Sequence, residues 1–573
     1  MLIDSMKKLK IILTVTILIS GCKNESASVN KELVEGRDII TTHAMVVTSH
    51  PQSSRNGAII LQKGGNAVDA AVAVEFSLAV CYPEAGNIGG GGFMLIRNND
   101  GSKSVIDYRE KAPLEAARDM YLNNSGKIIE GLSTETHLAS GVPGTVDGMI
   151  KIHSRYGKLN FRDVIQPAID LAEKGFPVTS GQAASLNRNR EYFIRKNAVM
   201  PAFVRDSPWK EGDILRQPEL AVTLKRIRDL GREGFYSGET ADLIVKEMKR
   251  GNGIITKKDL EEYSSTFREP LTTEYKGFDL TTVPPPSGGG ITLIQLLGMV
   301  EAFPLREWGF HSVKSVHLIT EAERRAFADR SEFSGDADFV NVPVKELLNK
   351  KYLMERMLDF IEDKASSSSL IKAGNLTAAE SEETTHYSVA DQYGNAVAAT
   401  TTLNNTFGSG IVVEGAGFLL NNEMDDFSVK PGEPNIYGLT GGDANAIEPG
   451  KRMLSSMTPV IVEKDGKLFL VAGSPGGSTI PTTVFQVIIN VLDYNMNVSE
   501  AVDTGRFHHQ WLPDWISMES NSIDSLILNE LKLMGHEFRE RTSIGSVNAI
   551  HILPDGKIEG SADRRGYNSA CGY

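Results

Sequence analysis

The chain has very few cysteines. Three occur among its 573 residues, at Cys22, Cys81 and Cys571. This number is too small for the disulfide framework of a small secreted domain or for a four-cysteine zinc site. We expect Cys81 and Cys571 to be buried thiols, and a single bridge between them is the alternative.

An excess of positive charge is also missing. The chain has 60 Lys and Arg against 73 Asp and Glu, which gives a formal net charge of −13. This balance argues against nucleic acid or an anionic membrane surface as the main partner. Hydrophobic residues make up 41% and charged residues 23% of the chain, which excludes a disordered or fibrous protein. Its length suits one large domain or about two to three ordinary ones.

Near its start the chain has no apolar run long enough to cross a bilayer as a helix. The short apolar run Ile11–Ile19 follows a lysine-rich stretch and precedes Ser20-Gly21-Cys22. This order is typical of a targeting segment, and small residues before a cysteine resemble a bacterial lipoprotein signal. We therefore predict a signal peptide over residues 1–22 that ends at a lipidated Cys22, and an exported, periplasmic or membrane-anchored protein. The alternative is an ordinary secretory signal in which Cys22 is incidental.

The spacings that would bind a nucleotide or a metal are absent. The glycines Gly89–Gly92 enter an apolar strand, whereas phosphate loops lead into a helix. Ala472 stands where a nucleophile elbow around Ser474 would need glycine. In His508-His509 the side chains are expected on opposite faces of a strand, with no carboxylate at ligand spacing nearby. We expect no cofactor and no metal.

Apolar periodicity predicts a layered α/β protein with its sheets at the centre. Early in the chain we expect a strand at Met45–Thr48, a helix at Ala67–Val80 and a hairpin turn at Asn98–Gly101. From residue 144 to about residue 335 the pattern is mostly helical. Strands return after residue 384. We expect strands at residues 384–390 and 396–403, a continuation of that sheet at 411–413 and 417–420, and later hairpins at 458–473 and 547–562.

The residue pattern of the chain changes at Thr384. A polar tract rich in Ser and Ala ends at Glu383, and a two-residue alternation typical of a half-buried strand begins at once. Cutting the Glu383–Thr384 bond would leave a hydroxyl and a free α-amine on one residue, which is an activated nucleophile. The intrinsic pKa of an α-amine is about 7.7–8.0, so this amine can take the hydroxyl proton near neutral pH.

Ordered motifs along the chain resemble one family, the γ-glutamyltranspeptidases or glutathione hydrolases, which are N-terminal nucleophile hydrolases. The resemblance extends from about Val46 to Tyr573. It rests on residues 64–71, 89–93, 141–144, 384–388, 420–427, 454–457, 473–477 and 506–511.

The resemblance implies a four-layer αββα sandwich and a precursor that cuts itself before its nucleophile. Residues 23–383 would form a large subunit with a flexible tail at 361–383. Residues 384–573 would form the small catalytic subunit.

The resemblance also implies the roles of the site residues. Thr384 would be the nucleophile and, through its freed amine, the base, with Thr402 hydrogen-bonded to it. The backbone N–H groups of Gly476 and Gly477 would bind the oxyanion. The remaining residues would bind substrate: Arg109, Ser455 and Ser456 at the α-carboxylate, Asn404, Glu423 and Asp426 around the α-ammonium, and Tyr437 in a lid at residues 430–445.

The implied activity is cleavage of the γ-glutamyl bond of glutathione and related compounds through a threonine acyl-enzyme. Water or the amine of an amino acid or peptide would then accept the glutamyl group. One alternative is a glutaryl-cephalosporin-type acylase of the same fold, whose substrate lacks the α-ammonium. A second alternative is an inactive exported binding protein.

Overall fold

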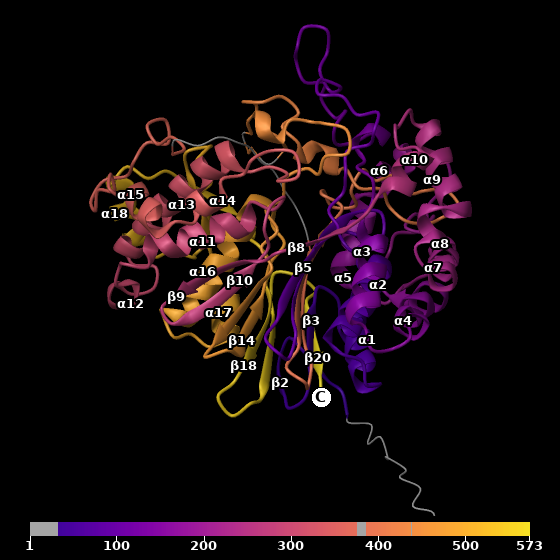
Figure 1. The fold of residues 1–573 in the computed structure, drawn as a ribbon, viewed down its shortest axis with the longest axis horizontal. Helices are drawn as coiled ribbons and strands as arrows, with labels where there is room; N and C mark the ends of the chain where they lie inside the picture. The colour runs from indigo at the N-terminus through magenta and orange to yellow at the C-terminus, as the bar shows by residue number, and fades with distance from the viewer. Residues whose placement is uncertain (1–31, 375–384, 437, 440) are drawn as a thin grey trace, which may run out of the picture. The chain divides into compact units, whose positions relative to one another are not determined.

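The computed structural model describes residues 32–374, 385–436, 438–439 and 441–573. The predicted signal peptide with Cys22, the scissile pair Glu383 and Thr384, and Tyr437 lie outside these residues. Residues 33–573 form one unit in which two sheets lie at the centre and helices cover both outer faces (Figure 1). Within the described part, no helix combines the length and the apolar character needed to cross a membrane.

The first sheet has eight strands, and each neighbouring pair is antiparallel. In spatial order its strands are β1 (Val34–Gly36), β20 (Ser569–Gly572), β3 (Met45–Thr48), β11 (Thr385–Ala390), β12 (Ala396–Thr402), β4 (Gly91–Arg97), β5 (Lys103–Asp107) and β8 (Thr266–Arg268).

The second sheet has seven antiparallel strands. Its order is β2 (Asp38–Thr41), β19 (Ile558–Ala562), β18 (Asn548–Ile552), β14 (Lys467–Ala472), β13 (Val460–Lys464), β10 (Phe278–Thr282) and β9 (Leu271–Tyr275). Two small sheets add β15 (Phe507–His508), β16 (Ile516–Glu519) and β17 (Phe538–Arg541), and β6 (Phe176–Pro177) with β7 (Ile214–Leu215).

The helices fall into two groups, one on each outer side of the sheets (Figure 1). On the first sheet's side lie α1 (Pro51–Gln62), α2 (Ala67–Cys81), α3 (Thr145–Tyr156), α4 (Phe161–Lys174), α5 (Ser180–Arg188), α6 (Arg190–Lys196), α7 (Pro218–Leu230), α8 (Glu233–Tyr236), α9 (Gly238–Arg250) and α10 (Lys257–Glu262). On the second sheet's side lie α11 (Gly289–Val300), α12 (Leu305–Trp308), α13 (Val313–Phe333), α14 (Val344–Leu347), α15 (Lys350–Arg356), α16 (Ile480–Leu492), α17 (Val498–Asp503) and α18 (Ser525–Leu533).

Side-chain alternation along the strands produces three apolar layers. In β4, Met94 and Ile96 join the core under the first helix group, whereas Phe93 and Leu95 join the core between the sheets. Successive strand residues point to opposite faces, so one apolar strand serves both cores. Val460 and Val462 of β13 belong to the third core, under the second helix group. This confirms the predicted αββα architecture.

Helix α2 shows why such a buried element still begins at a definite residue. The Asn66 side chain accepts a hydrogen bond from the Asp69 N–H, and the Asp69 carboxylate accepts one from the Asn66 N–H at 2.9 Å. This capping box satisfies two N–H groups that have no partner inside the helix. Every residue from Ala67 to Cys81 is buried.

Most of the expected strands and helices are present, and one expectation is wrong. Residues 411–413 and 417–420 do not extend the sheet, and Val412 and Leu419 form only an isolated bridge. The left-handed φ angles of Gly415 and Gly417, +78° and +76°, turn the chain away from the extended conformation there. The region between residues 144 and 335 is mostly helical, as expected, but it also contains the short strands β6 to β10, which the sequence pattern did not indicate.

The cysteine expectation is confirmed. Cys81 and Cys571 are both buried and unbridged. Burial raises the pKa of the Cys571 thiol to about 12 and also raises that of Cys81, so neither thiol ionises near neutral pH.

A buried carboxyl group links α2 to the first sheet. Glu75 is fully buried and accepts a hydrogen bond from the Tyr387 hydroxyl of β11 at 2.8 Å. Burial raises its pKa from an ordinary value of 4.5 to about 7, because the ionised form loses its hydration. The folded state therefore holds this proton more tightly than the unfolded chain. The stability that the proton contributes is complete below pH 4.5 and is lost as the pH rises to about 7.

We expect Glu75→Gln to remove this loss. Between about pH 5 and about pH 8, the variant should lose about 2–3 kcal/mol less unfolding free energy than the wild type. Urea unfolding at the two pH values measures the difference. Glu530→Gln, on the exposed side of α18, is the control and should follow the wild type. Parallel pH profiles for Glu75→Gln and the wild type would contradict the expectation.

Candidate active site

The predicted site residues converge where neighbouring strands of both sheets begin or end. In the first sheet, Thr385 pairs with Thr401, Thr402 pairs with Gly91, and Phe93 pairs with Asp107. The start of β11, the end of β12, the start of β4 and the end of β5 therefore share one edge. In the second sheet, Val460 pairs with Ala472, which brings the segments before β13 and after β14 together.

The two edges meet at His386 and Gly473. A Cβ atom on Gly473 would lie 2.3 Å from the His386 ring, so only glycine allows the turn after β14 to lie against β11. The His386 ring contacts the hydroxyl groups of Thr400 at 2.9 Å and Ser388 at 3.1 Å. Burial lowers its pKa to about 3, so the ring is neutral near pH 7 and does not supply a cation to the site.

The first described residues of β11 are fixed from other elements. The Thr385 hydroxyl lies 2.9 Å from the Ser49 hydroxyl, and the Asn548 amide donates to the His386 carbonyl oxygen at 2.8 Å. The chain that follows residue 384 is thereby held from β18 and from the segment before α1. Thr384 itself lies outside the described residues.

The turn formed by residues 473–477 leads from β14 into the 3₁₀ turn Gly477–Thr479 and then into α16. Gly476 and Gly477 have φ angles of +132° and +62°, in the left-handed region that favours glycine. A Cβ atom on Gly476 would also approach the Thr479 hydroxyl to 2.5 Å. Backbone N–H groups at a helix N-terminus are ready donors to an anion, and the helix dipole favours negative charge there.

Arg109 lies two residues beyond β5 and is fully buried. It forms ion pairs with Glu423 and Asp426, and its guanidinium lies 3.6 Å from Glu110. It also donates to the carbonyl oxygens of Met453 at 3.3 Å and Leu454 at 2.9 Å. One buried cation thus faces three buried carboxyl groups.

The cluster holds more carboxyl groups than its one guanidinium can pair. Burial raises the pKa of Glu110 to about 8 against the opposing effect of Arg109, and burial raises the pKa of Glu423 well above its ordinary value. Burial lowers the pKa of Arg109, but its carboxylate neighbours raise it further, so the guanidinium stays charged. Glu423 Oε2 and both carboxyl oxygens of Glu110 make no hydrogen bond within the described structure. Such buried acceptors are costly unless a ligand satisfies them.

Asn404 and Thr402 lie at the end of β12, beside this cluster. The Asn404 N–H donates to the Thr402 hydroxyl at 2.7 Å, and its side-chain amide donates to the Asn422 carbonyl oxygen at 3.0 Å. Asn404 adopts a φ of +72°, a conformation that asparagine tolerates better than most residues. The chain therefore bends sharply from β12 toward the segment that carries Glu423.

Ser455 and Ser456 precede β13 and contact the start of α11. The Ser455 carbonyl oxygen accepts from the Gly288 N–H at 2.8 Å, and Arg330 of α13 donates to the Ser456 hydroxyl. A Cβ atom on Gly289 would lie 2.2 Å from the Ser456 carbonyl oxygen, which explains the glycines in this turn.

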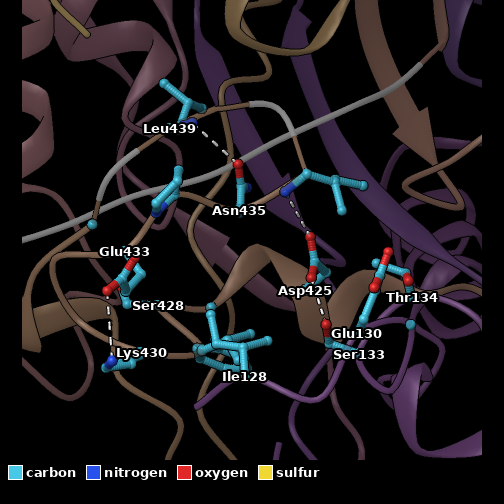
Figure 2. A pocket seen from close by; sticks show the side chains of 16 residues that line it. Ile128, Glu130, Ser133, Thr134, Asp425, Ser428, Lys430, Glu433, Asn435 and Leu439 are labelled. Carbon is cyan, nitrogen blue, oxygen red and sulfur yellow. Dashed lines mark hydrogen bonds and ion pairs between the residues drawn. The ribbon is translucent and has the colours of Figure 1, made fainter. Parts of the chain in front are cut away.

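The neighbouring carboxylates Asp425 and Asp426 have different partners. Asp426 pairs with Arg109, whereas Asp425 accepts from the Ser133 hydroxyl at 2.6 Å and from the Ile436 N–H of the predicted lid at 3.4 Å. Figure 2 shows Asp425 beside Ser133, and both line a cavity of about 230 Å³ together with residues of the predicted lid. A second cavity, of about 510 Å³, is lined by Gln510, which accepts from the Ser478 hydroxyl beside Gly477 at 2.7 Å.

One group of side chains in the described structure has metal-ligand spacing, namely His317, Glu321 and His536. The Glu321 carboxylate already accepts from Arg325 at 2.6 Å, Arg324 at 3.3 Å and the Ser366 N–H at 3.0 Å. The rings of His317 and His536 are hydrogen-bonded to each other, with 2.7 Å between Nδ1 of His317 and Nε2 of His536. The two guanidinium groups on the carboxylate disfavour the binding of a metal cation beside them, so this group is a hydrogen-bonded network.

Sequence reasoning missed Glu110 and Arg330. Glu110 follows Arg109 directly, and a charged pair after an apolar strand was a usable signal. Arg330 gave no such signal, because α13 carries so many charged residues that it resembles a solvated helix. In the structure its residues Glu321, Glu323, Arg324, Arg325, Asp329 and Arg330 are all buried.

Comparisons with known proteins place this arrangement in a family. The family described as Gamma-glutamyltranspeptidase matches residues 53–573. The glutathione hydrolase proenzyme of Escherichia coli (strain K12) is 47% identical over 534 residues, which cover 92% of each chain. The acylase ACY 1 proenzyme of Pseudomonas sp. (strain V22) is 36% identical over 529 residues, or 91% of this chain and 92% of the relative. A crystal structure of cephalosporin acylase from Bacillus halodurans superposes with a TM-score of 0.82 at 25% identity, covering 94% of this chain and 97% of the other.

Proposed function

The chain belongs to the gamma-glutamyltranspeptidase family, and we propose that it cleaves the γ-glutamyl bond of glutathione and related compounds with Thr384 as its nucleophile. The observation that carries the proposal is the buried cluster of one guanidinium and three carboxyl groups around Arg109. A γ-glutamyl group ends in an α-carboxylate and an α-ammonium, and both need charged partners when they leave water.

The cluster can supply both partners by exchanging its own ion pairs. Without substrate, Glu423 and Asp426 hold the fork of Arg109. An entering α-carboxylate would take over the fork of Arg109, for which a bidentate carboxylate is the natural ligand. The α-ammonium would then compensate Glu423 and Asp426, with Asn404 beside them and Ser455 and Ser456 beside the carboxylate.

The proposed chemistry has two halves. Thr384 Oγ attacks the γ-carbonyl carbon while the freed α-amine of the same residue takes the hydroxyl proton. The C–N bond breaks, the proton passes to the leaving amine, and a glutamyl ester remains on Thr384. Water or the amine of an amino acid or peptide then attacks this ester and releases the threonine. Gly476 and Gly477 support this role because their N–H groups lie at the start of the 3₁₀ turn that leads into α16, and a helix N-terminus stabilises negative charge.

The same hydroxyl would first mature the protein. Thr384 Oγ attacks the Glu383 carbonyl carbon, the peptide C–N bond breaks, and the nitrogen becomes the α-amine that later serves as the base. Hydrolysis of the resulting ester frees the hydroxyl and leaves a large subunit ending at Glu383 and a small subunit beginning at Thr384. The proenzyme names of the relatives support this processing.

We expect the protein to turn over a γ-glutamyl anilide with a kcat/KM at least about 100-fold above that of the matching glutaryl anilide, because only the former can pair with the carboxylates. Asp426→Asn should narrow this preference. Asp425→Asn is the matched control. Asp425 is the neighbouring aspartate, but its carboxylate accepts hydrogen bonds from Ser133 and from Ile436 of the predicted lid and does not pair with Arg109. Equal or faster turnover of the glutaryl compound would favour the acylase alternative.

For the location of the protein we propose export and anchoring through a lipid on Cys22. The lysine-rich start, the short apolar run Ile11–Ile19 and the small residues before Cys22 support this proposal. Incorporation of a radioactive fatty acid into the wild type, but not into Cys22→Ser, tests it.

A further inference from the structure

The segment at residues 366–374 lies just upstream of the proposed cut and is bound by its backbone; we call it the docking segment. The N–H of Ser366 donates to Glu321 at 3.0 Å, that of Ser368 to Asp514 at 2.8 Å, and that of Gly374 to Asp329 at 3.0 Å. Amide-to-carboxylate bonds of this kind are stronger than bonds between neutral groups.

The partners of the docking segment come from both sides of the cut. Glu321, Arg324 and Asp329 lie on α13, upstream of residue 384. Trp511 and Asp514 lie downstream of it. The Trp511 indole N–H points at two carbonyl oxygens of the segment, those of Ser368 at 3.0 Å and Ile371 at 2.9 Å. Arg324, which is 2% exposed, donates both to the Ser368 hydroxyl and to Asp514.

The loop that carries Trp511 and Asp514 is held in an unusual conformation. Trp511 has a φ of +66°, which is strained for a bulky side chain. The backbone N–H of Trp511 donates to His509 Nδ1 at 3.1 Å, and His509 Nε2 lies 3.3 Å from the Asp514 carboxylate. Burial lowers the pKa of His509 to about 4, so the ring is neutral and must donate from Nε2 to the Asp514 carboxylate. The ring therefore orients both groups toward the docking segment.

We propose that Trp511 and Asp514 are positioning residues for maturation, which hold the docking segment before the cut and keep it bound to the small subunit afterwards. The proposal rests on the proposed function, since it presumes a cut at Glu383–Thr384. Only residues 375–384 separate the docking segment from β11. If the segment were released, this connection would become about twice as long, and bringing its ends together would become about three-fold less probable.

The test compares maturation in Trp511→Phe/Asp514→Asn with maturation in the wild type. Phenylalanine keeps an aromatic ring but has no N–H, and asparagine keeps an oxygen acceptor but has no charge. On denaturing gels, we expect the half-time of cutting to lengthen by up to about three-fold, which is the limit for a fully released segment, because the bonds of Ser366 to Glu321 and of Gly374 to Asp329 remain in the variant. Once cut, the variant should keep kcat and KM for a γ-glutamyl anilide within about two-fold of the wild type, because neither residue contacts the Arg109 cluster. Hydrogen exchange of the amides of Ser366, Ser368 and Gly374 should quicken.

Asp213→Asn is the matched control. It weakens a partly exposed ion pair with Arg205 that resembles the pair between Asp514 and Arg324 but does not touch the docking segment. We expect it to mature at the wild-type rate. Thermal midpoints of the double variant and its parent, both in a Thr384→Ala background, separate a positioning effect from general destabilisation. If the double variant does not fold, the two single variants are measured in its place.

Maturation of the variant at the wild-type rate would overturn the proposal. A delay matched by an equal delay in a control variant with the same loss of thermal midpoint would do so as well. A wild-type protein that never cuts, or that yields a small fragment with another N-terminal residue, would instead refute the proposed function.

Discussion

Thr384→Ala is expected to remain a single chain of full length and to show no γ-glutamyl transfer or hydrolysis. The substitution removes the only atom proposed to attack either the Glu383 carbonyl or the substrate. It also keeps the nitrogen of residue 384 in an amide, so the general base never forms. When a nucleophile and its base act together, loss of the nucleophile lowers kcat by orders of magnitude, and we expect kcat to fall at least about 10⁴-fold.

Denaturing gels and N-terminal sequencing of the small fragment measure the cut, and a γ-glutamyl anilide with and without a dipeptide acceptor measures the activity. Thr384→Ser is the matched variant because it keeps a hydroxyl and, after the cut, an α-amine. It should mature slowly and retain activity. Two fragments from Thr384→Ala would show that another group cuts the chain, and the assignment of the nucleophile would be lost.

The second large effect is expected from Arg109→Lys. The guanidinium of Arg109 contacts Glu423, Asp426 and two backbone carbonyl groups at once. A lysine ammonium is a compact point charge that cannot reproduce this fork. We expect kcat/KM for γ-glutamyl substrates to fall about 100-fold, mainly through KM, because the lost contact holds the α-carboxylate in both the ground state and the transition state.

Arg109→Lys should still be cut into two chains, since the proposed cleavage uses Thr384 and not the carboxylate-binding fork. Arg118→Lys is the control because Arg118 pairs with Asp443 of the predicted lid and both side chains are exposed. Steady-state kinetics at fixed pH distinguish the two variants. An unchanged KM in Arg109→Lys would remove Arg109 from the binding site.

The sequence predicted those elements of the fold that form apolar runs with turn residues on either side. Met45–Thr48, Ala67–Val80 and the hairpin predicted at residues 458–473 stand out as apolar runs between turn residues, and each lies within two residues of its place in the structure. Strands β9 and β10 were missed because runs of polar residues, Thr272–Glu274 in β9 and Thr281–Thr282 in β10, interrupt the alternation that marks a strand, and both lie inside a long helical stretch. Strand β10 pairs with β13, whose residues lie about 180 positions further along the chain, and no local pattern contains that pairing.

In the site, too, single residues could be predicted from the sequence, whereas their long-range pairing could not. Family motifs identified Arg109, Glu423 and Asp426 one at a time, but not that they pair with one another in the absence of substrate. That pairing joins residues more than 300 positions apart and depends on the bend that Asn404 makes after β12. The buried charges of α13 were hidden for the same reason, since their partners come from segments distant in the sequence.

The order of strands in the first sheet has a consequence for assembly. Strand β20, downstream of the proposed cut, lies between β1 and β3, which are upstream of it, and β3 in turn lies between β20 and β11. The two chains of a cut protein would therefore be interleaved strand by strand within one sheet. Neither chain could leave without exposing unpaired backbone groups in the middle of that sheet. Active protein should consequently form from one continuous precursor, and two separately synthesised halves would have to fold together around each other.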